Sequence, residues 1–377
     1  MNKEESTDKR PFSTVTIVGL GLIGGSLALA LRRSGFNGRI VGVSRQNSLQ
    51  EAKRLNAIDG GFSYEELPLA VDASDLIVLA SPISTIMAHL RTLGAAGTRL
   101  KQGAVITDVG STKRSILQEG REQLPKHTVF IGGHPLSGSE RRGMTAADPF
   151  LFQNAYYVLT PAPGVPRAEV KRLGTFLEAT GARVVVLSAE DHDCIAATIS
   201  HLPQLLAVSL VRFLEDLGEN REQGIHLAAG GFRDMTRIAS SPYSVWRDII
   251  STNGDLIARV MDRFLESTRQ AHAGLEDKRL SHSFDKAART RAEIPRDSKG
   301  FLHRLWDVLV VVEDKPGMIA GIATPLAEKG VNIKDIEVLK VREGEAGTIR
   351  LAFESQEQAS KAVEQLNAKG YAARLRE

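Results

Sequence analysis

The chain contains 377 residues, enough for two or three domains, and its composition of 42% hydrophobic and 25% charged residues is ordinary for a globular protein. Its 48 basic and 45 acidic residues give a formal net charge of +3, and no dense basic stripe indicates a nucleic-acid partner. The single cysteine, Cys194, excludes an internal disulfide framework and fits a reducing cytoplasm; we expect a buried structural thiol rather than a nucleophile.

The beginning of the chain has no targeting pattern. Its first nine residues, MNKEESTDK, are polar, predict a disordered head and lack the apolar core of a signal peptide. No apolar run reaches the roughly 18 residues that a membrane-spanning helix requires. We therefore expect a cytoplasmic protein without a membrane partner.

Strand-like and helix-like runs alternate through residues 12–188. The strand candidates are short and rich in Val and Ile: TVTIVG, RIVGVS, DLIVLAS, GAVITDV, TVFIGG, AYYVLT and ARVVVLS. Helical patterns lie between most of them, and LIGGSLALALRRSG predicts a helix that ends at Gly35. This alternation is typical of an α/β domain whose largely parallel sheet has helices on both faces.

The first predicted strand leads directly into GLGLIGGS, where Gly19, Gly21 and Gly24 have G-x-G-x-x-G spacing. The first glycine would permit a tight turn, the second the close approach of a pyrophosphate, and the third close packing of helix on strand. Because the motif follows a strand and opens a helix, it predicts a Rossmann-type dinucleotide-binding domain over residues 12–188. We expect the cofactor also to contact Leu22, Ile23 and Ser81.

The tip of the second predicted strand bears on the choice of cofactor. A carboxylate that binds the ribose is expected about 20 residues after the glycines, but Ser44 and then Arg45 stand there. Without that carboxylate a 2′-phosphate is not repelled, and Arg45 offers it a partner. The pattern favours NADP; if Arg45 is only a solvated surface charge, the cofactor is NAD or either one.

Residues 189–295 contain no convincing strand. DHDCIAATISHLPQLLAVSLVRFLEDLG predicts one long helix with a kink at Pro203, and VWRDIISTNGDLIARVMDRFLESTRQAHAGL predicts further helix. Apolar helical surface of this extent is typically buried against a partner, so we expect an all-helical domain that forms a homodimer. The charged residues 281–303 look like a linker.

Residues 304–377 have the order strand, helix, strand, strand, helix, strand. The strand patterns are WDVLVVVED, VNIKDIEVLKV, TIRLAFES and YAARLRE, and the helical ones are PGMIAGIATPLAEKG and QEQASKAVEQLNAKG. This βαββαβ order predicts a compact ferredoxin-like domain.

Polar clusters follow two of the predicted strands. Asp108, Gly110, Ser111, Thr112 and Lys113 come after GAVIT, at an edge where open α/β sheets bind ligands. Ser111 is either a ligand contact or a helix N-cap, and both roles are compatible.

A histidine held between backbone-shaping residues, His134, follows TVFIG at a similar strand tip. Since a nicotinamide ring should arrive at this edge, we expect His134 to be catalytic. His192 and His201 lie nine residues apart on one predicted helix and so on roughly opposite faces, and His201 is the better candidate for the active site.

Two arginines in GGFRDMTRIA, Arg233 and Arg237, have the i, i+4 spacing of one helical face. Two neighbouring guanidinium groups suit an anion such as a dicarboxylate substrate. Salt bridges to Asp234 or Asp248 are the alternative. No residue pattern indicates a metal.

The motifs GLGLIGGS, DVGSTK, GGHPLSGSE, ISHLPQ and GGFRDMTRIASS together resemble the prephenate dehydrogenase family of tyrosine biosynthesis. The likeness runs from about Val15 to Arg263 in the family's order and spacing. The C-terminal unit resembles an ACT domain, a small amino-acid sensor, through its Asp-x-Pro-Gly loop and Asn-Ile pair. Those residues are Asp314, Pro316, Gly317, Asn332 and Ile333.

The resemblance implies oxidative decarboxylation of prephenate to 4-hydroxyphenylpyruvate with NAD(P)⁺. It implies that His134 accepts a hydrogen bond from the ring hydroxyl, that Ser111 assists there, and that His201 lines the pocket. It also implies that Arg237 grips a substrate carboxylate, with Arg233 and Glu140 close by. The sensor domain implies feedback by tyrosine, unless it only strengthens a dimer.

Alternatives remain at the level of the sequence. NAD-using members of the family commonly have Asp where Ser44 stands, which supports NADP. Nothing in the sequence separates prephenate from arogenate, which bears an amino group in place of a keto oxygen. A dehydrogenase for another acid, such as 3-phosphoglycerate, and an inactive scaffold that senses amino acids are the remaining hypotheses.

Overall fold

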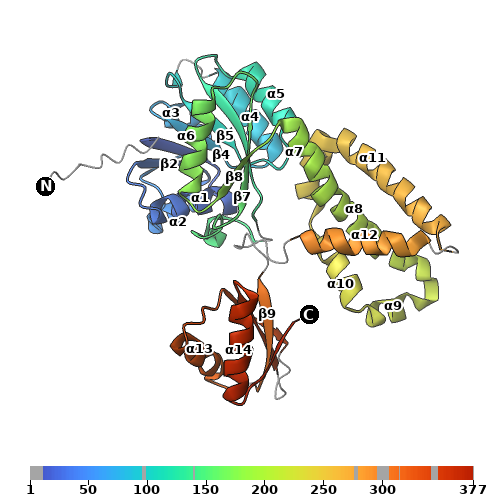
Figure 1. The fold of residues 1–377 in the computed structure, drawn as a ribbon. Coiled ribbons are helices and arrows are strands. Elements are labelled where there is room, and N and C mark those ends of the chain that lie inside the picture. The colour runs from blue at the N-terminus through green and yellow to red at the C-terminus, as the bar shows by residue number, and fades with distance from the viewer. Residues whose placement is uncertain are drawn as a thin grey trace. The chain divides into compact units, whose positions relative to one another are not determined.

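The protein is described here by a computed structural model, which covers residues 12–95, 99–138, 141–275, 279–294, 305–313, 315–340 and 347–376. The polar head MNKEESTDK lies outside the described residues. Contacts divide the chain into two compact units, Met1–His282 and Ser283–Glu377. The first unit contains a sheet domain and a helical segment, and the second contains a small antiparallel sheet (Figure 1).

The first unit is built on one eight-stranded sheet in the order β3-β2-β1-β4-β5-β6-β7-β8. All neighbouring strands run parallel except β6 and β7, as expected for a largely parallel sheet. The short β3 was not predicted, because three residues, GGF, carry no readable periodicity. The strands are β1 (Thr14–Val18), β2 (Arg39–Val43), β3 (Gly60–Phe62), β4 (Leu76–Leu79), β5 (Val105–Asp108), β6 (Val129–Pro135), β7 (Tyr156–Pro161) and β8 (Arg183–Val186).

Helices cover both faces of this sheet, and each face has its own hydrophobic cluster. Successive side chains of a strand point to opposite faces, so Val15 and Ile17 of β1 enter one cluster and Val18 enters the other. The helices are α1 (Leu22–Arg33), α2 (Gln46–Arg54), α3 (Leu67–Ala70), α4 (Ile83–Ala95), α5 (Arg114–Gln123) and α6 (Arg167–Glu178), with a 3₁₀ turn at Met144–Ala146. The expected Rossmann-type domain is confirmed.

The helical segment that follows begins with the predicted long helix: α-helical, π-helical and 3₁₀ turns run without interruption from Ala189 to a break at Gly218. Pro203 has no N–H to donate, and a π-helical turn at Ala197–His201 directly precedes its helix. Gly218, with φ of 54°, breaks the next stretch. The elements are α7 (Ala189–Ala196), the π turn, α8 (Leu202–Arg212), a 3₁₀ stretch (Phe213–Asn220), α9 (Arg221–Leu227), α10 (Gly230–Thr236), a 3₁₀ turn (Arg237–Ser240) and α11 (Tyr243–Ala273).

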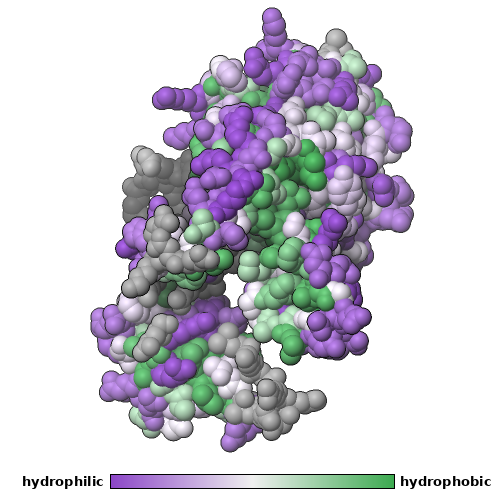
Figure 2. Space-filling model, turned by 90° about the vertical axis from the view of Figure 1, so that its right-hand side faces the viewer, coloured by the Kyte–Doolittle hydropathy of each residue, from purple (hydrophilic) through white to green (hydrophobic). Residues whose placement is uncertain are grey.

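Large apolar side chains remain exposed on this segment. On the face shown in Figure 2 hydrophobic side chains gather in a band over it. The exposed residues include Ile195, Ile199, Val211, Phe213, Leu217, Ile225, Leu227 and Met235. Cys194 is exposed as well, so the expectation of a buried thiol is wrong, although the residue before it on α7, Asp193, is buried.

Among the described residues, one stretch, Ala189–Leu227, is long and apolar enough to cross a membrane by length and composition alone. Its mean hydropathy is 1.7 over a window that is 33% buried, so the expectation that no run would reach this length is wrong. Helices in cores and interfaces pass the same test, and one such helix is a weak indication of a membrane span.

Two carboxylates of the helical segment fasten it to the sheet domain. Asp193 of α7 accepts hydrogen bonds from the backbone N–H groups of Lys113 (2.7 Å) and Arg114 (2.9 Å), at the start of α5. Asp248 of α11 accepts from the N–H of Ser84 (2.9 Å) and from its hydroxyl (2.7 Å), in the first turn of α4. Both carboxylates therefore satisfy donors that a helix N-terminus leaves unpaired.

Within the second unit, residues 306–375 form a sheet of strand order β10-β11-β9-β12 with the helices α13 and α14, which confirms the predicted βαββαβ domain. Its core is a separate hydrophobic cluster that includes Val308, Val310 and Leu351. The elements are β9 (Trp306–Val312), α13 (Met318–Glu328), β10 (Asp335–Lys340), β11 (Gly347–Phe353), α14 (Gln356–Ala368) and β12 (Ala372–Leu375). The predicted linker is wrong over its first half, because α12 (Arg279–Glu293) is helical.

Candidate active site

The glycine loop between β1 and α1 has the geometry that dinucleotide binding requires. Gly19 has φ of 102°, a conformation that favours glycine. A Cβ on Gly24 would lie 2.0 Å from the Gly19 carbonyl oxygen, so only glycine lets the helix pack this closely. A Cβ on Gly21 would meet nothing within 4 Å, which leaves that backbone open to a ligand.

The N-terminus of α1 fits the phosphates of a dinucleotide. No side chain caps this helix, and its first turn has no acidic residue to repel an anion. Leu22 and Ile23 are partly buried at this terminus, and Ser81 lies at the tip of β4 with its hydroxyl 3.5 Å from the Val18 carbonyl oxygen. These residues suit the expected cofactor site, and their roles in binding stay a prediction.

Ser44 and Arg45 lie at the tip of β2, where the ribose of a dinucleotide is expected. Ser44 is buried, and its hydroxyl accepts a weak hydrogen bond of 3.4 Å from the Leu20 N–H. Arg45 is exposed at the start of α2 and makes no ion pair with the described residues. The guanidinium is therefore available to an anionic ligand.

A buried ion pair lies behind the tips of β5 and β6. Lys113 and Asp108 are both fully buried and form a salt bridge. The Lys113 ammonium also donates to the Gly133 carbonyl oxygen at 2.6 Å, and Asp108 accepts from the Gly133 N–H at 3.1 Å. Burial lowers the pKa of Lys113, although the charge of Asp108 opposes that shift. Both backbone groups of the residue before His134 are thus held by one ion pair.

The partly buried imidazole of His134 begins a chain of polar groups that continues through the buried His192 and Asp193. Its Nδ1 lies 2.8 Å from Nε2 of His192, and the two rings meet edge to face with centroids 5.0 Å apart. Nδ1 of His192 lies 2.8 Å from Oδ1 of Asp193. Nε2 of His134 has no hydrogen-bond partner among the described residues, and this atom is not fully buried. It is the nitrogen left for a ligand.

The environment of His134 favours a neutral ring. Burial, and then three neighbouring basic side chains, hold the pKa of His134 well below the ordinary histidine value; these are His192, Lys113 and His201. A neutral imidazole with one open nitrogen accepts a proton or a hydrogen bond, which is what a general base does.

His201 lies at the same site as His192, which the sequence did not predict. Burial lowers the pKa of His201 to about 4, so the ring is neutral. The charge of Asp193 opposes this shift, and the neighbouring His192 adds to it. The π turn explains the error: each of its residues turns by less than the 100° of an α-helix, which rotates His201 back toward the side of His192.

Asn253 ties these groups together and was missed at the level of the sequence. Its amide nitrogen lies 3.3 Å from Nδ1 of His201 and donates to the Asp193 carbonyl oxygen at 2.9 Å. Its amide oxygen accepts from Arg114 at 3.0 Å. Asn253 is fully buried and has non-helical backbone angles inside α11, and only this local distortion could have singled it out.

Ser111 is partly buried in the loop between β5 and α5. It does not cap α5, which begins at Arg114 with Asp193 as the acceptor for its first N–H groups. Within the described residues the Ser111 hydroxyl has no partner, so it is free to contact a ligand. Its predicted assistance at the substrate hydroxyl stays a prediction.

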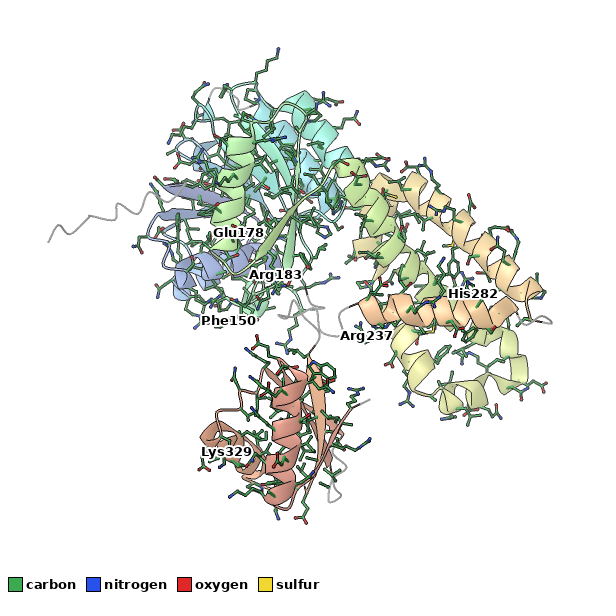
Figure 3. All side chains as sticks on the ribbon, in the orientation of Figure 1. Phe150, Glu178, Arg183, Arg237, His282 and Lys329 are labelled. Atoms are coloured by element: carbon green, nitrogen blue, oxygen red, sulfur yellow. The ribbon has the colours of Figure 1, made fainter. Side chains whose placement is uncertain are left out.

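The two arginines of GGFRDMTRIA are exposed on the helical segment. Arg233 is in α10, and Arg237 begins the 3₁₀ turn beyond its end, as labelled in Figure 3. The turn packs on α8, which directly follows the π turn that ends at His201, because Gln204 of α8 donates to the Ile238 carbonyl oxygen at 3.0 Å. Asp248, a suggested partner, is bound instead by Ser84 and Arg247. Glu140 lies outside the described residues.

The second unit has a cavity of about 610 Å³ beside the Asp-x-Pro-Gly loop, which the resemblance to an ACT domain singled out. Pro316 and Gly317 line it, Asn332 and Ile333 do not, and Asp314 lies outside the described residues. Glu313 and Lys315 are the charged groups in its lining. The rest of the lining is apolar and consists of Val312, Met318, Ile319, Ala320, Ala323, Val338, Gly347 and Ile349.

Three family models match successive parts of the chain. The nucleotide-binding domain of prephenate dehydrogenase matches residues 27–186, and its dimerization domain matches residues 188–287. An ACT domain matches residues 306–370. A prephenate dehydrogenase of Bacillus subtilis is 34% identical over 363 residues, which cover 94% of this chain and 96% of that protein.

Solved structures are similar as well. A prephenate dehydrogenase from A. aeolicus, crystallised with hydroxyphenyl propionate and NAD⁺, is 30% identical with a TM-score of 0.65, covering 75% of this chain and 98% of that one. An arogenate dehydrogenase from Synechocystis is 28% identical with a TM-score of 0.65, covering 74% of this chain and 98% of that one.

Proposed function

The chain belongs to the prephenate dehydrogenase family, and from this premise we propose that it oxidatively decarboxylates prephenate to 4-hydroxyphenylpyruvate with His134 as the base. The observation that carries the proposal is an imidazole at a strand tip of the dinucleotide-binding sheet, with Nε2 unpaired among the described residues and surroundings that lower its pKa. As an enzyme of this family, the chain is not the inactive sensor that the sequence alone left open.

The proposed chemistry removes a hydride from the alcohol carbon and a proton from the hydroxyl oxygen that the carbon bears. The nicotinamide ring, when bound, accepts the hydride. Nε2 of His134 takes the hydroxyl proton as the hydride leaves, because the carbon then becomes carbonyl-like and its hydroxyl acidic. The ring carboxylate departs as carbon dioxide, and its bonding electrons make the ring aromatic. The imidazolium then returns the proton to the phenolate oxygen, which restores the neutral base.

The other polar groups at the site are proposed to position the substrate. Ser111 offers a free hydroxyl at the adjacent strand tip, and the neutral His201 lines the pocket with its ring held by Asn253. Arg237, with Arg233, is proposed to bind a carboxylate of the substrate. Both guanidinium groups are exposed on the helical segment. Glu140 lies outside the described residues, and its place near the pocket mouth is proposed from the family resemblance alone.

NADP is the proposed preferred cofactor. The small, buried Ser44 presents no charge to a 2′-phosphate, and the exposed Arg45 is within one residue of it. The A. aeolicus relative binds NAD⁺ in its crystal, so NAD is the alternative for this chain.

Arogenate is the second candidate substrate. The similarity to the Synechocystis arogenate dehydrogenase favours it. The proposed catalytic groups act on the ring, which both substrates share, so turnover of each decides between them.

The C-terminal domain is proposed to sense tyrosine. Its mainly apolar cavity beside Pro316 and Gly317 is large enough for an aromatic side chain. Lys315 and Glu313 in its lining pair with each other at 2.7 Å, and a bound amino acid would exchange that pair for its own carboxylate and ammonium groups. The exposed apolar band of the helical segment and the match to a dimerization domain support a homodimer.

The test is a steady-state matrix on the purified protein: prephenate or arogenate, NAD⁺ or NADP⁺, with and without tyrosine. We expect prephenate to yield carbon dioxide, 4-hydroxyphenylpyruvate and one reduced nicotinamide per turnover, faster with NADP⁺, and tyrosine to inhibit. Turnover of arogenate alone would replace the substrate, and turnover of neither would refute the proposal.

A further inference from the structure

His192 has no role in the chemistry described above, and we propose that it is a positioning residue that fixes the tautomer of His134. In this arrangement Asp193 orients His192, and His192 places the single hydrogen of the neutral His134 ring on Nδ1. Nε2 is then left as the proton acceptor. The inference rests on the proposed function for the reaction, but the tautomer itself is a property of the protein alone.

The argument begins at the carboxylate of Asp193, which is fully buried. Burial would raise the pKa of Asp193, but hydrogen bonds from His192 and from the N–H groups of Arg114 and Lys113 lower it overall, so the group is ionised. An ionised carboxylate only accepts hydrogen bonds. The hydrogen between Oδ1 of Asp193 and Nδ1 of His192, 2.8 Å apart, therefore belongs to His192.

When His192 carries a single hydrogen, that hydrogen is the one on Nδ1, and its Nε2 is unprotonated. This atom lies 2.8 Å from Nδ1 of His134, a hydrogen-bond distance that requires one hydrogen between them. That hydrogen must then be on Nδ1 of His134, because Nε2 of His192 has none to give. Since a neutral imidazole has only one N–H, Nε2 of His134 is the free acceptor.

The same contacts support the ring after it takes a proton. The imidazolium keeps its Nδ1–H bond to His192, and the negative charge of Asp193 lies one ring further along the chain of hydrogen bonds. This is the logic by which a buried carboxylate holds the histidine of a serine hydrolase in its productive tautomer. Here a second imidazole stands between the carboxylate and the base.

Two substitutions separate positioning from simple packing. His192→Phe keeps a ring of similar size but removes both nitrogens, whereas His192→Gln retains a side-chain oxygen that can accept from His134. The control is His89→Phe: His89 is also a buried histidine and stacks on Tyr64 with centroids 5.5 Å apart.

We expect His192→Phe to lower kcat about 10²-fold while the KM for prephenate changes by no more than about threefold. His192→Gln should recover most of that loss, and His89→Phe should retain wild-type kcat. Equal losses in both His192 variants would indicate packing alone and overturn the inference.

Nitrogen NMR of histidine-labelled protein reads the tautomer without substrate, with the His134 signals identified by their absence in His134→Asn. We expect wild-type His134 to have its hydrogen on Nδ1 and His192→Phe to lose this preference. A hydrogen on Nε2 in the wild type would overturn the inference, whether or not the variants fold. If instead the wild type shows the expected tautomer but turns over neither substrate, the proposed function fails and the positioning role stands.

Discussion

The ammonium of Lys113 donates to the carbonyl oxygen of Gly133 at 2.6 Å, one residue before His134, and this contact links the buried core of the sheet to the proposed base. The same ammonium is paired with Asp108, which accepts from the N–H of Gly133. A buried ion pair thus fixes the backbone from which the imidazole projects. Orientation of this kind matters because a misplaced base loses much of its effect.

Lys113→Met tests this link. The substitution leaves Asp108 buried without its partner, so we expect a loss of about 3–5 kcal/mol in the free energy of unfolding, measured by urea denaturation. Lys113→Met combined with Asp108→Leu removes both charges and should recover part of that stability. We expect kcat to be lower than wild type in both variants, because neither retains the two hydrogen bonds that the ion pair makes to the backbone of Gly133. If the single variant were as stable as wild type, the ion pair would not be holding this strand tip.

The pH dependence of kcat/KM follows from the depressed pKa of His134. The neutral ring is the active form, so activity is full above the pKa of His134 and falls tenfold per pH unit below it. Because that pKa is held well below the ordinary histidine value of 6.5, we expect kcat/KM to remain on its plateau as the pH falls through 6.5. An acid limb centred at that value or above would contradict a base that this environment keeps neutral.

Much of this site could be predicted from local sequence. The glycine loop, the strand tips that carry Ser111 and His134, and the order of the C-terminal domain all follow from short patterns in which neighbouring residues determine the structure. The three-residue β3 was missed because it is too short for any periodicity to be read.

The part that could not be predicted depends on long-range contacts. Asp193 caps α5, which begins about 80 residues earlier in the chain, and no local sequence pattern indicates that contact. The relation of His192 to His201 was inferred from ideal α-helical geometry, and a π turn at Ala197–His201 made that inference wrong. The role of Asn253 could be recognised only from the structure, in which α11 packs against α7 and Asn253 donates to the carbonyl oxygen of Asp193.

Arg237→Ala should mainly raise the KM for prephenate. Removing a charged partner of a bound carboxylate costs binding that the ground state and transition state share, so kcat should change little. Arg269→Ala is the control, because Arg269 is an exposed arginine on α11 that pairs only loosely with Glu266, at 3.5 Å. A large fall in kcat with unchanged KM would show that Arg237 acts on the reacting atoms instead.

Ser44→Asp should shift the cofactor preference toward NAD⁺. A carboxylate at the tip of β2 repels a 2′-phosphate and offers the ribose hydroxyl an acceptor, so the ratio of kcat/KM for NADP⁺ to that for NAD⁺ should fall about tenfold or more. Asn47→Asp adds the same charge at an exposed position of α2 and controls for net charge. Equal ratios in the two variants would place Ser44 away from the ribose.

The most direct measurement is the single-turnover rate of nicotinamide reduction by His134→Asn with saturating prephenate, compared with wild type and with His226→Asn. His226 is a control on α9, where 75% of its side chain is exposed. If His134 is the base, its loss should slow the step about 10²-fold or more, with prephenate binding largely retained and His226→Asn unchanged. A near-normal rate in His134→Asn would contradict the account, because the proton would then have to leave by a route that needs no imidazole at this strand tip.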